Sequence, residues 1–158
     1  MFNIVIDHLS EDEEIAVVNS TTGNRRVQLE PVVSGRDILD FQHVIRQIPV
    51  AESVVRYAVN LVRATRPADK SSPDFVRTWL NYGASLRASQ YLILGGKARA
   101  VIQGRYNVSV DDIRYLALPV LRHRILTNFH AESEQVDSDK IIQKLIETVP
   151  APKSGIHG

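Results

Sequence analysis

The residues best suited to binding chemistry are Gly83-Ala84-Ser85-Leu86-Arg87, which lead into a long apolar segment. An arginine in the first turn of a helix opposes the helix dipole, at a cost of about 0.3 to 1 kcal/mol when it is exposed. The N–H groups at a helix N-terminus bind anions, and a guanidinium beside them matches the oxygens of a phosphate. A phosphate contact by Arg87 is therefore one interpretation, and an outward-pointing side chain or an ion pair with Asp74 is the other.

Motifs for other kinds of chemistry are absent from the sequence. It has neither the phosphate-binding loop Gly-x-x-x-x-Gly-Lys-Ser/Thr nor an apolar strand that ends in paired acidic residues for magnesium. The five histidines have no metal-binding spacing, no serine-nucleophile elbow is present, and the lack of cysteine excludes disulfides and thiol catalysis. We therefore assign no catalytic residue and no metal ligand, and we expect no nucleotide hydrolysis by this chain alone.

Composition places the chain among ordinary globular domains. Of its 158 residues, 44% are hydrophobic and 23% are charged. No apolar run reaches the roughly 20 residues of a membrane span and no signal-peptide pattern opens the chain, so we expect a cytoplasmic protein without membrane contact. A net charge of +1 makes nucleic acid an unexpected partner. The basic residues are mostly arginine, which is suited to contacts with phosphates or carboxylates. A GC-rich genome, which favours arginine codons, is the alternative explanation.

Apolar periodicity and capping residues predict a mainly helical fold that would hold Arg87 at the start of its central helix. The predicted helices follow Ser10 and Ser34, cover residues 54–65, 74–82 and 86–102, run from Ser109 to Leu126, and cover residues 139–149. Short strands are predicted at residues 2–6 and 106–108, and a weakly alternating extended segment at residues 25–33. Within the central helix, Gly95 and Gly96 predict close packing against another backbone.

Several stretches of this chain resemble the C-terminal region of MoxR-type AAA+ ATPases. They are Ile48-Pro49-Val50 with residues 55–66, Tyr82-Gly83-Ala84-Ser85-Leu86-Arg87-Ala88-Ser89, residues 108–113, and Pro119-Val120-Leu121-Arg122-His123-Arg124. Residues 2–14 resemble the end of the family's ATPase core, where a strand and an acidic helix follow an Asp-Arg-Phe segment. The resemblance implies that residues 1–33 are the end of the AAA+ core and a connector, residues 34–149 the helical AAA+ lid-type bundle, and residues 150–158 a loose tail.

The same resemblance implies a role for Arg87 as the sensor 2 arginine, which reaches from the lid to the γ-phosphate of the nucleotide. Leu86 stands where the family's Gly-Ala-Ser-Pro-Arg-Ala motif has proline, so the fixed φ that helps to start the helix is missing. ATP and Mg²⁺ would be bound by the full-length parent, whose phosphate loop, magnesium-binding acidic pair and arginine finger would lie upstream of Met1, and neither is expected on this fragment alone. The resemblance further implies a chaperone-like homo-oligomer, usually a hexamer, that acts on an unspecified client protein.

Two other classes of function compete with an ATPase lid. Short helices joined by turns also occur in helical adaptors that bind protein or DNA, although near-neutral charge and scattered arginines argue against DNA. An independent enzyme is the third class, and no motif in the sequence supports it.

Overall fold

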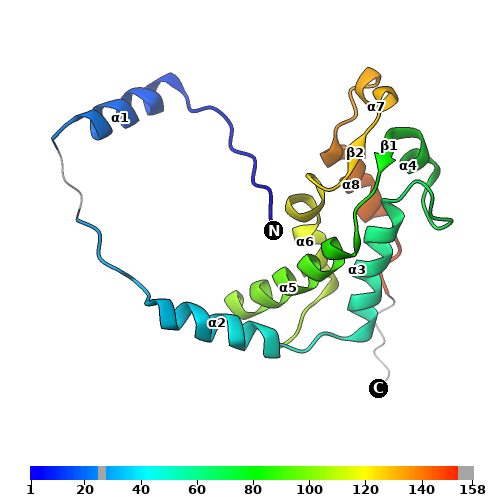
Figure 1. Ribbon diagram of the computed structural model, residues 1–158, viewed down its shortest axis with the longest axis horizontal. Coiled ribbons are helices and arrows are strands. Elements are labelled where there is room, and N and C mark those ends of the chain that lie inside the picture. Colours follow the sequence, from blue (N-terminus) through cyan, green and yellow to red (C-terminus); the bar gives the residue numbers. More distant parts are fainter. Residues whose placement is uncertain (25–27, 153–158) are drawn as a thin grey trace.

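The computed structural model describes residues 1–24 and 28–152 and shows a body of packed helices with an N-terminal arm that reaches away from it (Figure 1). The arm comprises residues 1–10 and α1 (Glu11–Thr22). The body contains α2 (Gly35–Gln47), α3 (Glu52–Ala64), α4 (Asp74–Trp79), β1 (Leu80–Tyr82), α5 (Leu86–Ile102), α6 (Val110–Leu121), β2 (Leu126–Thr127), α7 (Phe129–Ser133) and α8 (Ser138–Thr148). The predicted mainly helical fold is confirmed. Residues 25–27 of the predicted extended segment and residues 153–158 of the predicted tail lie outside the described residues.

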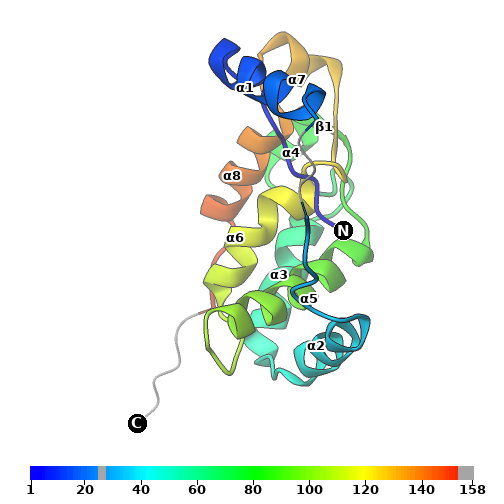
Figure 2. The ribbon, with the colours of Figure 1, turned by 90° about the vertical axis from the view of Figure 1, so that its left-hand side faces the viewer.

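The core of the body lies between α3, α5, α6 and α8 (Figure 2). The apolar stripe predicted on residues 54–65 is buried as a whole, and Leu61 and Val62 have no exposed surface. Helix α5 packs against α2, α3 and α6, which confirms it as the central helix. Within the described part of the chain, no helix is both long and apolar enough to cross a membrane.

The N-terminal arm forms α1 as predicted but not the predicted strand at residues 2–6. The Ser10 N–H donates to the Glu13 carboxylate at 2.9 Å in a capping box, and no residue of α1 is buried. Residues 2–6 pair with no other strand of the described chain. A β-strand needs a partner for its N–H and C=O groups, so this stretch forms no strand. Among the described backbone groups of this stretch, the one hydrogen bond to the body runs from the Asn3 N–H to the Pro119 carbonyl at 2.8 Å.

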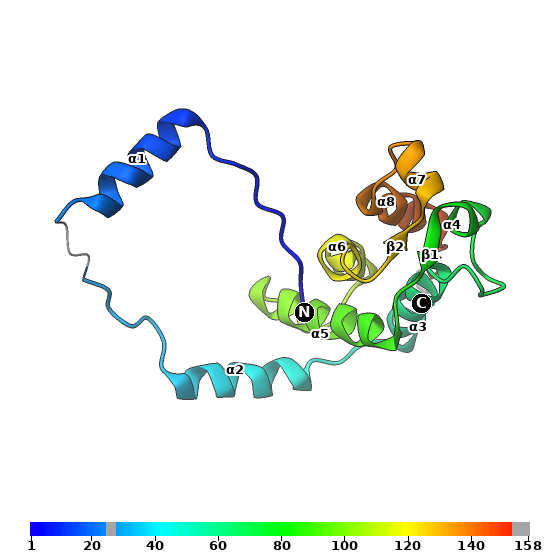
Figure 3. The same ribbon diagram turned by 45° about the horizontal axis from the view of Figure 1, so that its top comes forward.

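The helix predicted after Ser34 is present as α2, but most of its apolar side chains are uncovered. Ile38, Phe41 and Val44 are 43%, 53% and 47% exposed. The inner side of α2 contacts α5, and the Lys97 ammonium of α5 donates to the carbonyl of Arg46 at 3.0 Å. α2 is therefore attached to the body while much of its apolar surface stays exposed. The helix lies across an open space from the arm (Figure 3).

Two glycines in α5 allow side chains to approach the helix closely. A Cβ atom on Gly95 would lie 2.9 Å from Leu116 Cδ1 and 3.0 Å from Phe2 Cζ, and one on Gly96 would lie 2.8 Å from Val108 Cγ1. The predicted close packing is confirmed, but the predicted backbone neighbour is wrong. The space that the missing Cβ atoms leave is filled by side chains from α6, from the loop before it and from the arm.

An antiparallel ladder between β1 and β2 changes two of the predicted helices. Tyr82 pairs with Leu126 in this ladder, so the helix predicted over residues 74–82 ends at Trp79. The helix predicted to reach Leu126 ends at Leu121, and the Leu126 side chain is 54% exposed. Ladder bonds between distant segments have replaced local helical bonds here. Residues 106–108, predicted as a strand, have no strand partner and form a loop.

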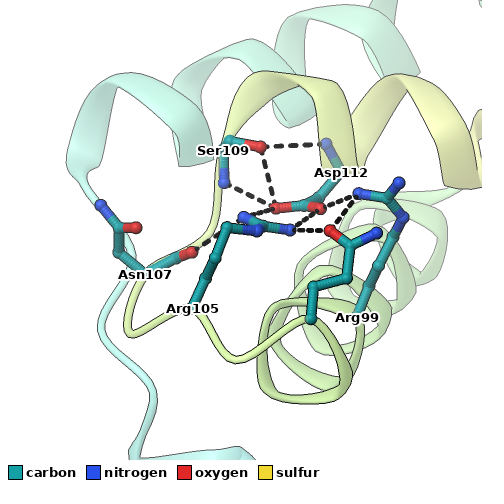
Figure 4. A network of polar contacts seen from close by, with 6 residues as sticks. Arg99, Arg105, Asn107, Ser109 and Asp112 are labelled. Atoms are coloured by element: carbon teal, nitrogen blue, oxygen red, sulfur yellow. Dashed lines mark hydrogen bonds and ion pairs between the residues drawn. The ribbon is translucent and has the colours of Figure 1, made fainter.

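The carboxylate of Asp112 holds α5 and α6 together at the loop between them (Figure 4). The Asp112 side chain is fully buried and accepts hydrogen bonds from the Ser109 N–H at 2.8 Å, from Arg105 at 2.8 Å and from Arg99. Burial raises the pKa of Asp112, but the hydrogen bonds from Arg105, Ser109 and Arg99 outweigh it and hold the pKa well below its usual value. The buried carboxylate therefore stays charged and paired.

Replacing Asp112 by asparagine should destabilise the body. Asp112→Asn keeps the size of the side chain but leaves the Arg99 and Arg105 guanidinium groups without their shared anion, so we expect the free energy of unfolding to fall by about 3 kcal/mol. Urea denaturation measures the change. Asp111→Asn is the matched control, because the Asp111 side chain is 83% exposed and lies 3.6 Å from Arg114, and it should change stability by less than about 0.5 kcal/mol. Equal losses in the two variants would contradict the role of the network.

The same network predicts acid sensitivity. Because the pKa of Asp112 is lower in the folded than in the unfolded chain, its stabilising contribution is present above the unfolded pKa of about 3.9 and is lost as the pH falls toward the folded pKa. Below about pH 4, wild-type stability should therefore fall more steeply than that of Asp112→Asn. Urea midpoints measured across the acid range test this, and parallel curves would count against it.

Candidate functional site

The start of α5 is fixed by a close approach of the Gly83 backbone to the end of α3. A Cβ atom on Gly83 would lie 2.3 Å from the Thr65 carbonyl oxygen and 2.6 Å from Arg66 Cα, distances at which no side chain fits. Both atoms belong to the backbone and have little freedom to move. Glycine is therefore required for the chain to pass from β1 into α5 at this place.

The next residue, Ala84, is bound on both of its backbone groups. Its N–H donates to the Thr65 hydroxyl at 2.8 Å, and its carbonyl accepts from Arg66 Nε at 2.9 Å. The Thr65 hydroxyl in turn donates to the Val62 carbonyl at 2.6 Å, and both Thr65 and Ala84 are buried. We call these contacts of Gly83 and Ala84 with Thr65 and Arg66 the α3–α5 clamp, because they join the C-terminal end of α3 to the N-terminal end of α5.

Helix α5 begins at Leu86 although the residue is not proline. Ser85 is the N-cap residue in an extended conformation, with φ −81° and ψ 172°, but its side chain makes no capping hydrogen bond. The first turn of α5 contains no acidic residue either. The clamp thus starts the helix without the fixed φ of proline, and no side-chain cap occupies the N–H groups of the first turn.

Arg87 lies in this first turn with an exposed side chain. Within residues 1–24 and 28–152, its guanidinium group takes part in no ion pair. The ion pair with Asp74 considered from the sequence does not form, because the Asp74 carboxylate binds Arg77 at 2.6 Å. The Arg87 side chain is exposed, an orientation from which it can contact a group outside this chain, so the phosphate contact stays a prediction.

A groove that was not predicted from the sequence runs beside the first turns of α5. Its volume is about 590 Å³, and it lies between α2, α3 and α5. Its walls are mainly apolar, with Val55 and Val59 on one side and Leu86 on the other, and Arg46 and Lys97 add charge at its edge. Val55 and Val59 lie one helical turn apart and outside the predicted buried stripe of α3, a pattern that indicates a second apolar face.

The histidines of the described chain lie apart from one another. Among the described residues, no three His, Asp or Glu side chains form a group able to hold a metal ion. His123 follows α6 and His130 lies in α7, so the two do not share a helix face. Partial burial and the neighbouring Arg124 lower the pKa of His123, which favours its neutral form. His130 lies 3.3 Å from Glu134 on the surface.

Comparisons with known proteins match the fold and the segment that contains the start of α5. Residues 75–145, which include the start of α5, match the family model of the AAA lid domain. The chain is 28% identical over 153 residues to the chaperone MoxR1 of Mycobacterium tuberculosis, covering 97% of this chain and 40% of MoxR1. It is 27% identical to the uncharacterized protein YeaC of Bacillus subtilis, covering 96% of this chain and 45% of YeaC.

A solved structure is also similar over almost the whole chain. The crystal structure of a proposed ATPase from Cytophaga hutchinsonii superposes with a TM-score of 0.84 at 32% identity, covering 97% of this chain and 47% of that one. The chain thus spans less than half the length of each of these relatives.

The clamp predicts a specific effect of removing the Thr65 hydroxyl. Thr65→Val has nearly the same shape but leaves the buried Ala84 N–H without its acceptor, so we expect a loss of about 1 to 3 kcal/mol in the free energy of unfolding. Hydrogen exchange at the Ala84 amide should become faster. In the control Thr78→Val, an exposed hydroxyl that donates to the Asp74 carbonyl is lost, and stability should change by less than about 0.5 kcal/mol. Unchanged exchange at Ala84 in Thr65→Val would contradict the clamp.

Proposed function

From the premise that this chain carries the lid domain of a MoxR-type AAA+ protein, we propose that it is the lid of an ATPase and that Arg87 is its sensor 2 residue. In this role Arg87 contacts the γ-phosphate of an ATP molecule held, with Mg²⁺, by the core of the same protein. The observation that carries the proposal is the exposed Arg87 in an uncapped first turn whose position the α3–α5 clamp determines. The family match favours this function over a helical adaptor.

The physical contribution of Arg87 is charge stabilisation in a cleft that closes. A guanidinium group has a planar fork of donors that fits phosphate oxygens, and its attraction to phosphate grows when water leaves the site. The N–H groups at the start of α5 point in the same direction as the helix dipole and favour the same negative charge. Loss of the γ-phosphate would remove the partner of Arg87, so the lid angle would follow the nucleotide state.

The uncovered surfaces of the arm and of α2 support a core as the partner of this lid. The ribbons of the arm and of α2 lie on opposite sides of an open space (Figure 3). On the arm, Ile4 and Ile6 are 76% and 86% exposed, and on α2 the Leu39 side chain is 65% exposed. Apolar surface of this extent is covered in stable proteins by another domain or subunit. We assign the covering role to the ATPase core. The relatives are more than twice as long as the part that this chain matches, so they have additional sequence that can form such a core.

In the complete protein, this lid would also take part in ring assembly. We propose a homo-oligomer, a hexamer by resemblance to the family, with chaperone-like action on a client protein. The relative MoxR1 carries the name chaperone, which supports the action without identifying the client.

Arg87→Ala in the complete protein should slow ATP turnover by about 100-fold, because a preorganised charge at the transferred phosphate is lost. Steady-state phosphate release measures the rate, and circular dichroism should show an unchanged fold since the Arg87 side chain is exposed. Arg77→Ala is the matched control: it removes an exposed arginine of the same body, whose partner is Asp74, and should leave turnover unchanged. Turnover of Arg87→Ala at the wild-type rate would reject the sensor 2 role.

A further inference from the structure

One side of α5 carries Arg87, Tyr91 and Gly95 at intervals of four residues. Residues four apart in a helix lie one turn above each other, so these three follow one another along the same side of α5. The second and third of them are in contact with groups that hold the beginning of the arm. The arm is therefore attached to the side of the helix on which Arg87 lies.

The closest of these contacts is made by the ring of Phe2. It lies against α5 at Gly95, where a Cβ atom would be 3.0 Å from Phe2 Cζ, and a second Cβ neighbour of the same position is Leu116 of α6. Gly95 thus opens a notch between α5 and α6 that admits an aromatic ring. Phe2 is 41% exposed, whereas the nearby Ile4 and Ile6 of the arm are 76% and 86% exposed.

A backbone hydrogen bond holds the next residue of the arm. The Asn3 N–H donates to the Pro119 carbonyl of α6 at 2.8 Å. In a longer helix this carbonyl would accept from the N–H of residue 123, but α6 ends at Leu121, two residues after Pro119. The end of α6 therefore offers an acceptor at the position where the arm passes.

Arg124 holds the residue before Phe2. Its guanidinium group donates to the Met1 carbonyl at 3.2 Å and to the Val120 carbonyl, and it lies over the Tyr91 ring with 5.1 Å to the ring centre. A guanidinium over an aromatic ring is held by cation–π attraction in addition to its hydrogen bonds. Arg124 thus links the arm to Tyr91, one turn from Arg87.

We propose that residues 1–3 are a strap that fastens the arm to α5 and α6, and that Gly95 is the notch that receives Phe2. The strap holds the arm in a fixed position on α5, the helix that carries Arg87. In the complete protein, and resting on the proposed lid function, a movement of the core segment that includes the arm is passed directly to α5. Phe2, Gly95 and Arg124 are therefore positioning residues for Arg87 and do not touch nucleotide themselves.

Nuclear magnetic resonance of the 158-residue chain tests the strap without nucleotide. We expect a nuclear Overhauser contact between the Phe2 ring and a Leu116 methyl group, and hydrogen exchange at the Asn3 amide about tenfold slower than at an unprotected amide. Phe2→Ala and Gly95→Ala should each abolish the slow exchange at Asn3. In Gly95→Ala, the ring contact should also be lost, since the new methyl group would occupy the notch.

Gly96→Ala is the matched control, because a Cβ atom at this position faces Val108 and not Phe2. It should keep both the ring contact and the slow exchange. Phe2→Ala alters only the arm, so it tests whether Phe2 fastens the arm even if a substitution in α5 disturbs the body. A wild-type chain without the ring contact, or slow Asn3 exchange that persists in Phe2→Ala, would overturn the proposal.

A second measurement separates this proposal from the lid function. In the complete protein, Phe2→Ala and Gly95→Ala should each slow ATP turnover, and the double variant should be no slower than either one, because both remove the same contact. Wild-type turnover in Arg87→Ala together with an intact ring contact would reject the sensor 2 role and leave the strap in place. A missing ring contact in the wild-type chain together with slow turnover in Arg87→Ala would reject the strap and leave the sensor 2 role in place.

Discussion

The passage of the Gly83 backbone against Thr65 and Arg66 is the constraint on which the arrangement of this molecule depends. With no room for a side chain at Gly83, and with both backbone groups of Ala84 bound, the first residue of α5 has one possible place relative to the end of α3. α5 is the helix that contacts α2, α3 and α6, so its starting point sets the position of the other helices as well. The direction in which Arg87 leaves the surface is a consequence of packing deep in the body, although Arg87 itself is exposed.

This division between a rigid interior and uncovered outer faces is typical of a domain made to work beside another. The core of α3, α5, α6 and α8 is closed, while α1, α2 and residues 4–9 present apolar side chains to the outside. The two properties belong together if the lid moves as one unit against a core: the interior has to stay intact while the outer faces exchange contacts. A mobile unit also needs a well-attached contact with its neighbour, which is the role that we propose for residues 1–3 on α5 and α6.

Much of the helical structure could be predicted because the signals are local. Ser10 and Ser109 mark helix starts through capping boxes that involve residues three positions away, and the buried stripe of α3 follows helical periodicity. The ladder of β1 and β2 was missed since it pairs residues more than 40 positions apart, and the uncovered face of α2 was missed since its amphipathic pattern does not tell which partner covers it. Arg87 was found because it opposes the helix dipole, a local conflict, whereas the clamp that positions it joins residues 18 and 19 positions apart in two different helix ends, a contact that no local pattern indicates.

The buried carboxylate between α5 and α6 has a consequence for the order in which the chain acquires its structure. Arg99 and Asp112 are 13 positions apart, so closing the loop between them costs little chain entropy. The α5–α6 hairpin can therefore assemble from neighbouring residues, and local contacts of this kind form faster than the distant pairing of β1 with β2. The α3–α5 clamp spans 18 and 19 positions, so it would form soon after the hairpin and bring α3 onto α5. The ladder of β1 with β2, which sets where the chain enters α5, would be completed last.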